Sequence, residues 1–164
     1  MEKEITEVYC GNGRGKTTLA IGQALRASSQ GKSVIIIQFL KGNERRELDF
    51  LEELDQLDIK IFRFEKMESC YDQLNEEEQA EEERNILNGL NFARKVIATQ
   101  ECDFLVLDEI LGLLDKHIAT VDMVVGLLKQ KDESMHLILT GNRVDPGILD
   151  YVDSVTTLGR EQNS

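Results

Sequence analysis

The chain has no tryptophan, a single proline and only three cysteines among its 164 residues. Cys10, Cys70 and Cys102 lie far apart and never form a Cys-x-x-Cys pair. Disulfide frameworks and structural zinc sites both require grouped cysteines, so the sequence predicts neither. We therefore expect a protein of the reducing cytoplasm.

Positive charge and long apolar runs are also scarce. The chain carries 19 basic and 31 acidic residues, which gives a net charge of −12. Because nucleic-acid binding depends on clustered lysine and arginine facing the phosphates, we expect no nucleic-acid partner. No run approaches the roughly 18 to 20 apolar residues that a membrane-spanning helix needs, and residues 1–4 do not resemble the start of a signal peptide. We therefore expect no membrane association.

The chain does contain an alternation of short apolar runs and segments with helical periodicity. This alternation predicts an α/β protein with a mainly parallel sheet. The length fits one domain over residues 1–164, since a chain of about 150 residues buries roughly 68–70% of its unfolded surface. The runs at 34–37 and 104–107 are continuously apolar, as in strands covered on both faces. The predicted strands are residues 5–9, 34–39, 59–64, 104–107, 136–140 and 154–158.

Apolar residues at helical spacing predict two helices. Gly31 stands where the first helix needs a left-handed cap at its end. Asn75, with Glu78 three residues later, predicts the capped start of the second. The glutamate-rich run at 76–83 predicts a solvated helix face near the positive end of the helix dipole. The core-facing positions are Ile21, Ala24, Leu25 and Ser28 in the first helix and Ile86, Leu90, Ala93 and Ile97 in the second.

A glycine-rich turn joins the first predicted strand to the first predicted helix. Glycines allow backbone N–H groups to turn inward around an anion, and the start of the helix adds its dipole. Lys16 supplies a positive charge, and the Thr17 hydroxyl is a suitable ligand for Mg²⁺. Cys10 takes the first glycine position of the GxxxxGK[ST] pattern, so this is a variant phosphate-binding P-loop. Its residues are Gly11, Asn12, Gly13, Arg14, Gly15, Lys16, Thr17 and Thr18.

Polar residues follow three further predicted strands. Asp108 and Glu109 follow the strand at 104–107, where an acid next to a P-loop can hold Mg²⁺ or its water shell against the phosphates. Gln38 and Lys41 lie at the end of the second predicted strand, and Arg143 follows the fifth. For these three, contact with a phosphate or an anionic substrate and an ordinary place in a surface turn are both open.

Four segments, in this order, resemble a known family. They are 11–18 (GNGRGKTT), 31–42 (GKSVIIIQFLKG), 107–109 (LDE), and 140–141 (TG) followed by DYVDSVT at 150–156. Together they resemble the ATP:corrinoid adenosyltransferases of the CobA/BtuR type, from about residue 5 to residue 158, in a short variant.

The resemblance implies a RecA-like P-loop fold, a mainly parallel sheet of about six strands with helices on both faces. It implies an enzyme, usually a homodimer, that transfers the 5′-deoxyadenosyl group of ATP to Co(I) of a corrinoid and releases triphosphate. The corrinoid would be cobalamin, cobinamide or cobyrinic acid a,c-diamide, reduced by an electron-donating reductase. Gln38 and Lys41 match the family's QFxKG segment and, with Arg143, join the implied binding residues.

The resemblance also implies roles within the P-loop region. Residues 11–18 would hold the departing triphosphate, and Lys16, Thr17 and Glu109 are the implied catalytic residues. Thr17 and Glu109 would bind Mg²⁺ or Mn²⁺, with Asp108 in its outer shell. Because the cobalt is the nucleophile, the protein needs no serine, cysteine or histidine for that step.

The sequence departs from the family pattern in two places. Residues 65–71 lack the FTW-like aromatic element that in the family shields the cobalt, and Tyr71 and Phe64 are the candidates to replace it. The usual TGRN-like order reads TGNR at 140–143, which moves Arg143 by one place. Two other functions remain open: a P-loop phosphotransferase, and a module that binds ATP or a corrinoid without catalysis.

Overall fold

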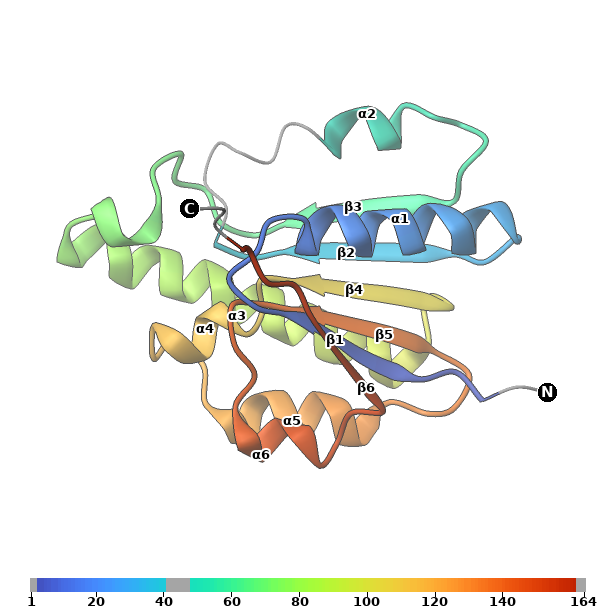
Figure 1. Cartoon of the computed structure of the whole chain (residues 1–164). Helices are drawn as coiled ribbons and strands as arrows, with labels where there is room; N and C mark the ends of the chain where they lie inside the picture. The colour runs from blue at the N-terminus through green and yellow to red at the C-terminus, as the bar shows by residue number, and fades with distance from the viewer. Residues whose placement is uncertain (1–2, 41–47, 162–164) are drawn as a thin grey trace.

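The protein forms a six-stranded parallel sheet in the order β3-β2-β4-β5-β1-β6 (Figure 1). The computed structural model describes residues 3–40 and 48–161. The α/β prediction is confirmed, and each strand lies within one residue of its predicted bounds. The strands are β1 (Thr6–Cys10), β2 (Val34–Gln38), β3 (Ile59–Arg63), β4 (Phe104–Asp108), β5 (His136–Thr140) and β6 (Ser154–Thr157).

The helices cover both faces of the sheet, as the sequence predicted. On one face lie α1 (Lys16–Ser29) and α2 (Asp49–Glu52) (Figure 1). On the other lie α3 (Glu76–Thr99), α4 (Gly112–Asp115), α5 (Val121–Gln130) and α6 (Pro146–Leu149). A short 3₁₀ turn, η2 (Tyr71–Gln73), precedes α3.

Side-chain alternation in the central strands β2 and β4 explains why their sequences are continuously apolar. Ile36 and Val106 pack in the layer that contains α1, whereas Ile37 and Leu105 pack in the layer that contains α3 and α5. Both strands are buried along their whole length. The burial predicted for these runs on both faces is therefore confirmed.

The predicted helix ends are also confirmed. Gly31 adopts a φ of +84° directly after the α1 cap. Asn75 and Glu78 form a reciprocal capping box, in which each side chain bonds to the other residue's backbone N–H. Helix α5 was not among the predicted helices, although Thr120 caps it by accepting a bond from Met123 N.

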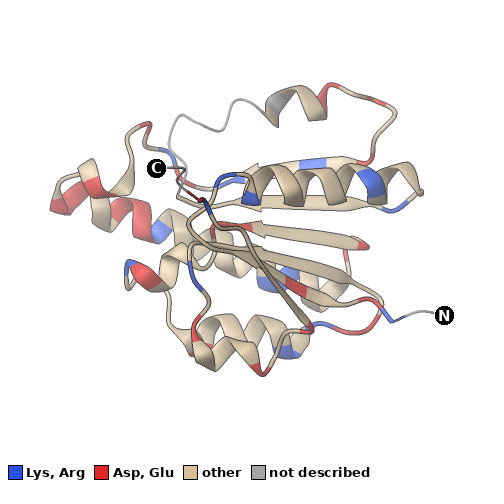
Figure 2. Ribbon diagram, in the orientation of Figure 1, with Lys and Arg blue, Asp and Glu red and all other residues tan. Residues whose placement is uncertain are grey.

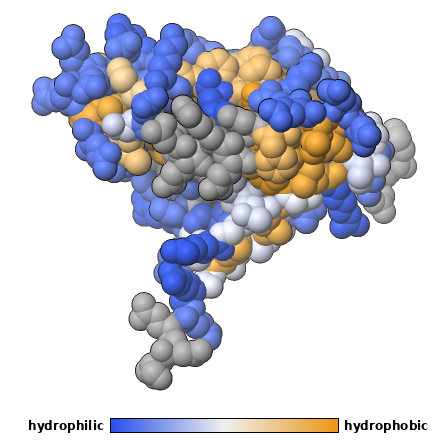
Figure 3. Space-filling view, turned by 90° about the horizontal axis from the view of Figure 1, so that it is seen from above, coloured by the Kyte–Doolittle hydropathy of each residue, from blue (hydrophilic) through white to orange (hydrophobic). Residues whose placement is uncertain are grey.

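The face that carries α1 and α2 has a hydrophobic area among hydrophilic side chains (Figure 3). The exposed apolar residues of α2 and the turn after it are Phe50 and Leu54, at 55% and 44% exposure. In the part of the chain that the structure describes, no helix has both the length and the apolar composition for a membrane crossing.

Candidate functional site

The P-loop leaves β1 and enters α1 through a turn that only glycine can form. Gly11 and Gly15 have φ angles of +113° and +102°, a conformation that side chains disfavour. A Cβ atom on Gly11 would also lie 2.3 Å from the carbonyl oxygen of Leu158. Glycine is therefore required at position 11 both for its backbone angle and for space.

Two segments from the end of the chain hold the P-loop in place. Gly11 N donates to the Asn142 carbonyl oxygen at 2.8 Å, and Gly13 N donates to the Leu158 carbonyl oxygen at 2.8 Å. Leu158 N donates back to the Cys10 carbonyl oxygen, also at 2.8 Å. The residues after β5 and β6 thus fix the shape of the loop.

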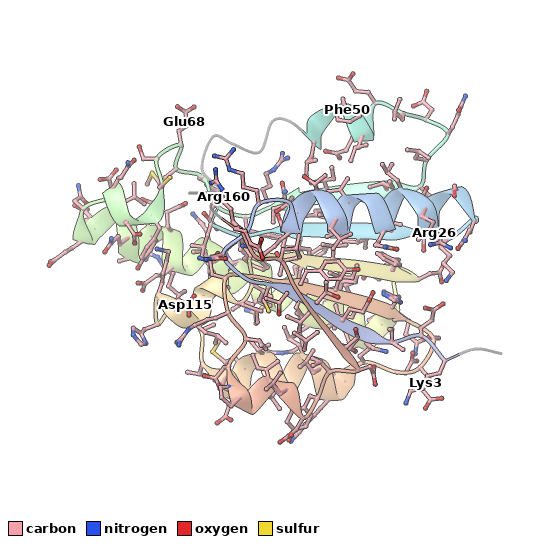
Figure 4. All side chains as sticks on the ribbon, in the orientation of Figure 1. Lys3, Arg26, Phe50, Glu68, Asp115 and Arg160 are labelled. Carbon is pink, nitrogen blue, oxygen red and sulfur yellow. The ribbon has the colours of Figure 1, made fainter. Side chains whose placement is uncertain are left out.

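Lys16 lies at the centre of this loop. Its Nζ donates to the Gly11 carbonyl oxygen at 2.6 Å and to Asn142 Oδ1 at 3.0 Å. Arg14 is exposed on the same turn, and Figure 4 shows Arg160 at this end of the sheet, on the segment that follows β6. Figure 2 shows basic residues at the start of α1, whereas acidic residues gather at the outer end of α3. The loop is therefore a local positive site on an acidic protein.

Asp108 is the buried carboxylate beside the P-loop. It is fully buried at the end of β4, and its Oδ1 accepts hydrogen bonds from Thr17 Oγ1 at 2.9 Å and Thr140 Oγ1 at 2.8 Å. Its Oδ2 accepts a bond from Gln38 Nε2 at 3.2 Å. Residues from α1, β2, β4 and β5 therefore converge on one carboxylate.

Glu109 lies next to Asp108 in an uncommon backbone conformation. Its φ is +64°, and its N–H donates to Thr140 Oγ1 at 2.8 Å. Its Oε2 lies 3.1 Å from the position that a Cβ atom would take on Gly112. Leu40, just after β2, has a similar φ of +59°. Backbone strain of this kind is common in functional sites, and here it follows the ends of two neighbouring strands.

The donor set of this edge fits a hard cation. The hydroxyl of Thr17 and the carboxylates of Asp108 and Glu109 offer oxygen ligands, which Mg²⁺ and Mn²⁺ prefer. Within residues 3–40 and 48–161, no three His, Cys, Asp or Glu side chains group into a metal site. A Mg²⁺ ion here would therefore take its other ligands from phosphate oxygens and water, as in nucleotide sites generally.

Comparison with known proteins identifies the family. The family model for the ATP:corrinoid adenosyltransferases BtuR/CobO/CobP matches residues 2–163. The chain belongs to this family. The resemblance inferred from the sequence is thereby confirmed.

Curated members of the adenosyltransferase family align over nearly the whole chain. The corrinoid adenosyltransferase of Escherichia coli K12 is 30% identical over 162 residues, which cover 96% of this chain and 77% of the relative. The Salmonella typhimurium enzyme CobA is 29% identical, with the same coverage. The Pseudomonas aeruginosa enzyme is 26% identical and covers 96% of this chain and 75% of the relative.

A solved structure supports the fold independently. A KaiC-like protein from Pyrococcus horikoshii matches with a TM-score of 0.64 at 20% identity, covering 96% of this chain and 72% of the other. The RecA-like fold expected of an adenosyltransferase of this type is therefore confirmed.

Arg143, one of the implied binding residues, lies beside a carboxylate of α4. Its Nε donates to Asp115 Oδ1 at 2.8 Å, a bond that raises the pKa of Arg143. Asn142 contacts Lys16 instead, because adjacent residues in an extended segment point in opposite directions. Arg143 and Asp115 line a cavity of about 280 Å³ beside α4 and α5. The structure thus places Asn142 beside the P-loop lysine and Arg143 beside Asp115, and contact of Arg143 with a phosphate stays a prediction.

Of the two residues in the family's QFxKG segment, the structure describes Gln38 but not Lys41. Gln38 is buried at the end of β2, and its Oε1 accepts a bond from Arg63 Nε at 2.9 Å. Lys41 lies outside the described residues. The sequence did not indicate Arg63, Thr140 or Asn142 as site residues. Each of the three lies within two residues of the end of a predicted strand.

The two candidate aromatic residues lie in different surroundings. Phe64 packs on Phe92, with ring centroids 5.4 Å apart, at the edge of the core. The Tyr71 hydroxyl donates to Glu83 Oε1 at 2.5 Å, and burial together with this bond raises the pKa of Tyr71 to about 12. Tyr71 is therefore a neutral side chain fastened to α3, and its substitution for the FTW-like element stays a prediction.

Proposed function

We propose that the protein transfers the 5′-deoxyadenosyl group of ATP to Co(I) of a corrinoid and releases triphosphate. The observation that carries this proposal is the family match over residues 2–163. The P-loop supports it, because the loop provides a phosphate site at the edge of the sheet where open α/β proteins bind ligands.

The chemistry requires little from the protein beyond placement and charge. The electron pair of Co(I) forms the bond to C5′ of the ribose, and the C5′–O5′ bond breaks. Its electron pair leaves with the triphosphate, and the cobalt becomes formally Co(III). Holding C5′ opposite the cobalt and stabilising the departing charge are therefore the tasks left to the chain.

The P-loop residues suit the second task. Loop N–H groups, the start of α1 and the Lys16 ammonium would surround the triphosphate. The carbonyl and amide oxygens now around Lys16 Nζ would give way to phosphate oxygens. Thr17, Asp108 and Glu109 would hold Mg²⁺, directly or through water, and the ion would neutralise charge on the leaving group.

The finer parts of the proposal rest on the family and the composition. We infer a single nucleotide-binding domain that acts as a homodimer and receives reduced corrinoid from an electron-donating reductase. The cytoplasm is the compartment we infer, since Cys10, Cys70 and Cys102 are free thiols.

Product analysis tests the proposal directly. The protein would be incubated without oxygen with ATP, Mg²⁺ and cob(I)alamin, and both products identified by chromatography and absorbance. We expect adenosylcobalamin and triphosphate in equal amounts. Formation of ADP would indicate a phosphotransferase instead, and ATP binding without any product would indicate a binding module.

Comparing two lysine variants distinguishes the effect of the P-loop lysine on ATP binding from a general effect of lost positive charge. We expect Lys16→Ala to weaken ATP binding by about 100-fold, because the variant loses a charge-assisted contact to phosphate. Lys95→Ala is the matched control, since Lys95 is exposed on α3. Equal ATP affinity of the two variants in calorimetry would contradict the P-loop assignment.

A further inference from the structure

A row of polar side chains crosses four neighbouring strands at their carboxyl ends. Arg63, Gln38 and Asp108 are the last residues of β3, β2 and β4 and are paired in register. Thr140, the last residue of β5, continues the row through its bond to Asp108.

The row lies on the face of the sheet that α1 covers. Two residues earlier in each strand, Ile61, Ile36, Val106 and Ile138 belong to the apolar layer packed on α1. Because residues two apart in a strand share a face, the polar row continues this layer toward the P-loop. Asp108 of this row therefore accepts a hydrogen bond from Thr17 at the start of α1.

Donors and acceptors along the row fit only one arrangement. A guanidinium donates hydrogen bonds and accepts none, so the Gln38 amide must turn its Oε1 to Arg63 and its Nε2 to Asp108. Its Oε1 then faces β3, where Arg63 Nε donates to it at 2.9 Å. A neutral residue at position 63 without a donor would remove the bond that fixes this orientation of the amide.

The segment that follows Arg63 is hydrogen-bonded to the end of β2 and to α3. Leu40 N donates to Glu65 Oε1 at 2.5 Å, which ties this segment to the end of β2. Lys66 N donates to Glu82 Oε1 at 3.0 Å, and Glu82 is a buried residue of α3. The edge strand therefore ends in a fixed position, as a positioning role for Arg63 requires.

We propose that Arg63 is a positioning residue of the nucleotide site, acting through Gln38 on Asp108 and hence on the Thr17 hydroxyl. Thr17 Oγ1 donates to Asp108 Oδ1 at 2.9 Å, so this bond fixes the direction of the hydroxyl proton. This inference rests on the proposed function only in requiring that the P-loop binds ATP with Mg²⁺.

Magnesium dependence of ATP binding is the readout, and it needs neither corrinoid nor catalysis. ATP would be titrated calorimetrically into the full chain in EDTA and in a series of Mg²⁺ concentrations. The magnesium gain is the ratio of the ATP Kd in EDTA to that at saturating Mg²⁺. We expect Arg63→Met to lower this gain by about 10-fold, the lower end for residues that support metal ligands. The Kd in EDTA should stay within about twofold, because Arg63 contacts Gln38 and not the P-loop lysine.

Matched variants exclude a general effect of lost charge or stability. Arg26→Met makes the same change at an exposed position at the far end of α1 (Figure 4), and we expect a wild-type gain. Arg63→Lys keeps a charged donor and should restore part of the gain. Melting temperatures of all variants are measured alongside. If Arg63→Met fails to fold, Gln38→Met decides, because Arg63 acts through this amide, and an unchanged gain in Gln38→Met overturns the proposal.

A double-mutant cycle tests the route through Gln38. If Arg63 acts through this amide, Arg63→Met should add nothing to the loss caused by Gln38→Met. Additive losses, an unchanged gain in Arg63→Met, or equal weakening with and without Mg²⁺ would each overturn the proposal. Absence of ATP binding by the wild type would overturn both this inference and the proposed function. ATP binding without adenosyl transfer would overturn the proposed function alone.

Discussion

The two ends of strand β4 carry aspartates five residues apart that belong to different kinds of polar cluster. Asp108, at the carboxyl end, is fully buried and accepts bonds from the neutral groups of Thr17, Thr140 and Gln38. Asp103, just before the amino end, is exposed and accepts a bond from Ser33 N at 3.0 Å.

Beyond Asp103, the amino end of the sheet carries a cluster of acidic, basic and histidine side chains that contact one another. The His136 ring lies 2.6 Å from Glu7 and 3.1 Å from Glu4, and Lys32 lies 2.6 Å from Glu4. The ring also stacks on Phe104, with centroids 4.7 Å apart. This cluster links residues near the amino ends of several strands, whereas Asp108 is buried among neutral hydrogen-bond donors beside the P-loop. The two ends of β4 therefore have different polar surroundings.

The largest difference between the two ends of the sheet should come from replacing a glycine at each end. We expect Gly11→Ala, at the carboxyl end, to abolish measurable ATP binding and to lower the free energy of unfolding by at least about 2 kcal/mol, since strain and a clash add. Gly31→Ala, at the amino end, has a similar φ but no atom within 4 Å of its added Cβ. It should cost about 1–2 kcal/mol of stability and leave ATP affinity unchanged.

Urea unfolding and ATP calorimetry on the same preparations measure both quantities. If Gly31→Ala weakened ATP binding as much as Gly11→Ala, the close approach of Leu158 to Gly11 would not be what the site requires.

The two aspartates of β4 provide the next test. Asp108→Asn keeps the shape of the side chain but removes its charge and places an amide against two hydroxyls. We expect about 10- to 100-fold weaker ATP binding in Mg²⁺ and a smaller loss in EDTA. Asp103→Asn should cost under about 1 kcal/mol of stability and leave the magnesium dependence at the wild-type value. A magnesium effect of equal size in both variants would remove the distinction between the two ends.

The smallest effect concerns pH at the amino end. The hydrogen bond from Lys32, opposed by burial and helped by His136, lowers the pKa of Glu4 from its usual value of 4.5. A carboxylate with a lowered folded pKa stabilises the protein above the unfolded pKa, and this contribution is lost as the pH falls through the folded value. Glu4→Gln should therefore cost under about 1 kcal/mol at pH 7, because the pair is partly exposed.

Unfolding free energies measured from pH 3 to pH 7 check this prediction. The difference between wild type and Glu4→Gln should shrink toward the acid end of the range. A difference that grew on acidification would have the wrong sign, and ATP affinity at pH 7 should be the same in both proteins.

The sequence could predict those parts of the site whose signal is contiguous. Residues 11–18 follow one strand and begin one helix, so local spacing was enough to identify the P-loop. The carboxylate pair Asp108 and Glu109, at the end of β4, was found in the same way. Local spacing does not tell which of the two faces α1, because that depends on how side chains alternate along the strand. Asp108 shares the α1 face with Val106 and so meets Thr17.

The parts that the sequence did not predict depend on neighbours far along the chain. Arg63 gains its role only because β3 pairs with β2 in register, which no local pattern reveals. The contact of Asn142 with Lys16 was not predicted, because the direction of its side chain depends on the path of the segment after β5. Helix α5 was missed although its capping residue, Thr120, precedes a strongly apolar stretch.

The bonds between the P-loop and Leu158 also bear on the order of events during synthesis. The loop leaves the ribosome long before its backbone partner, because Leu158 follows Gly13 only after β2, β3, β4, β5 and β6. A nascent chain that has made β1, α1 and even β5 still lacks the residue that fixes Gly13. The P-loop is therefore translated well before the contact that completes it, so chains made only as far as β5 should have little affinity for ATP.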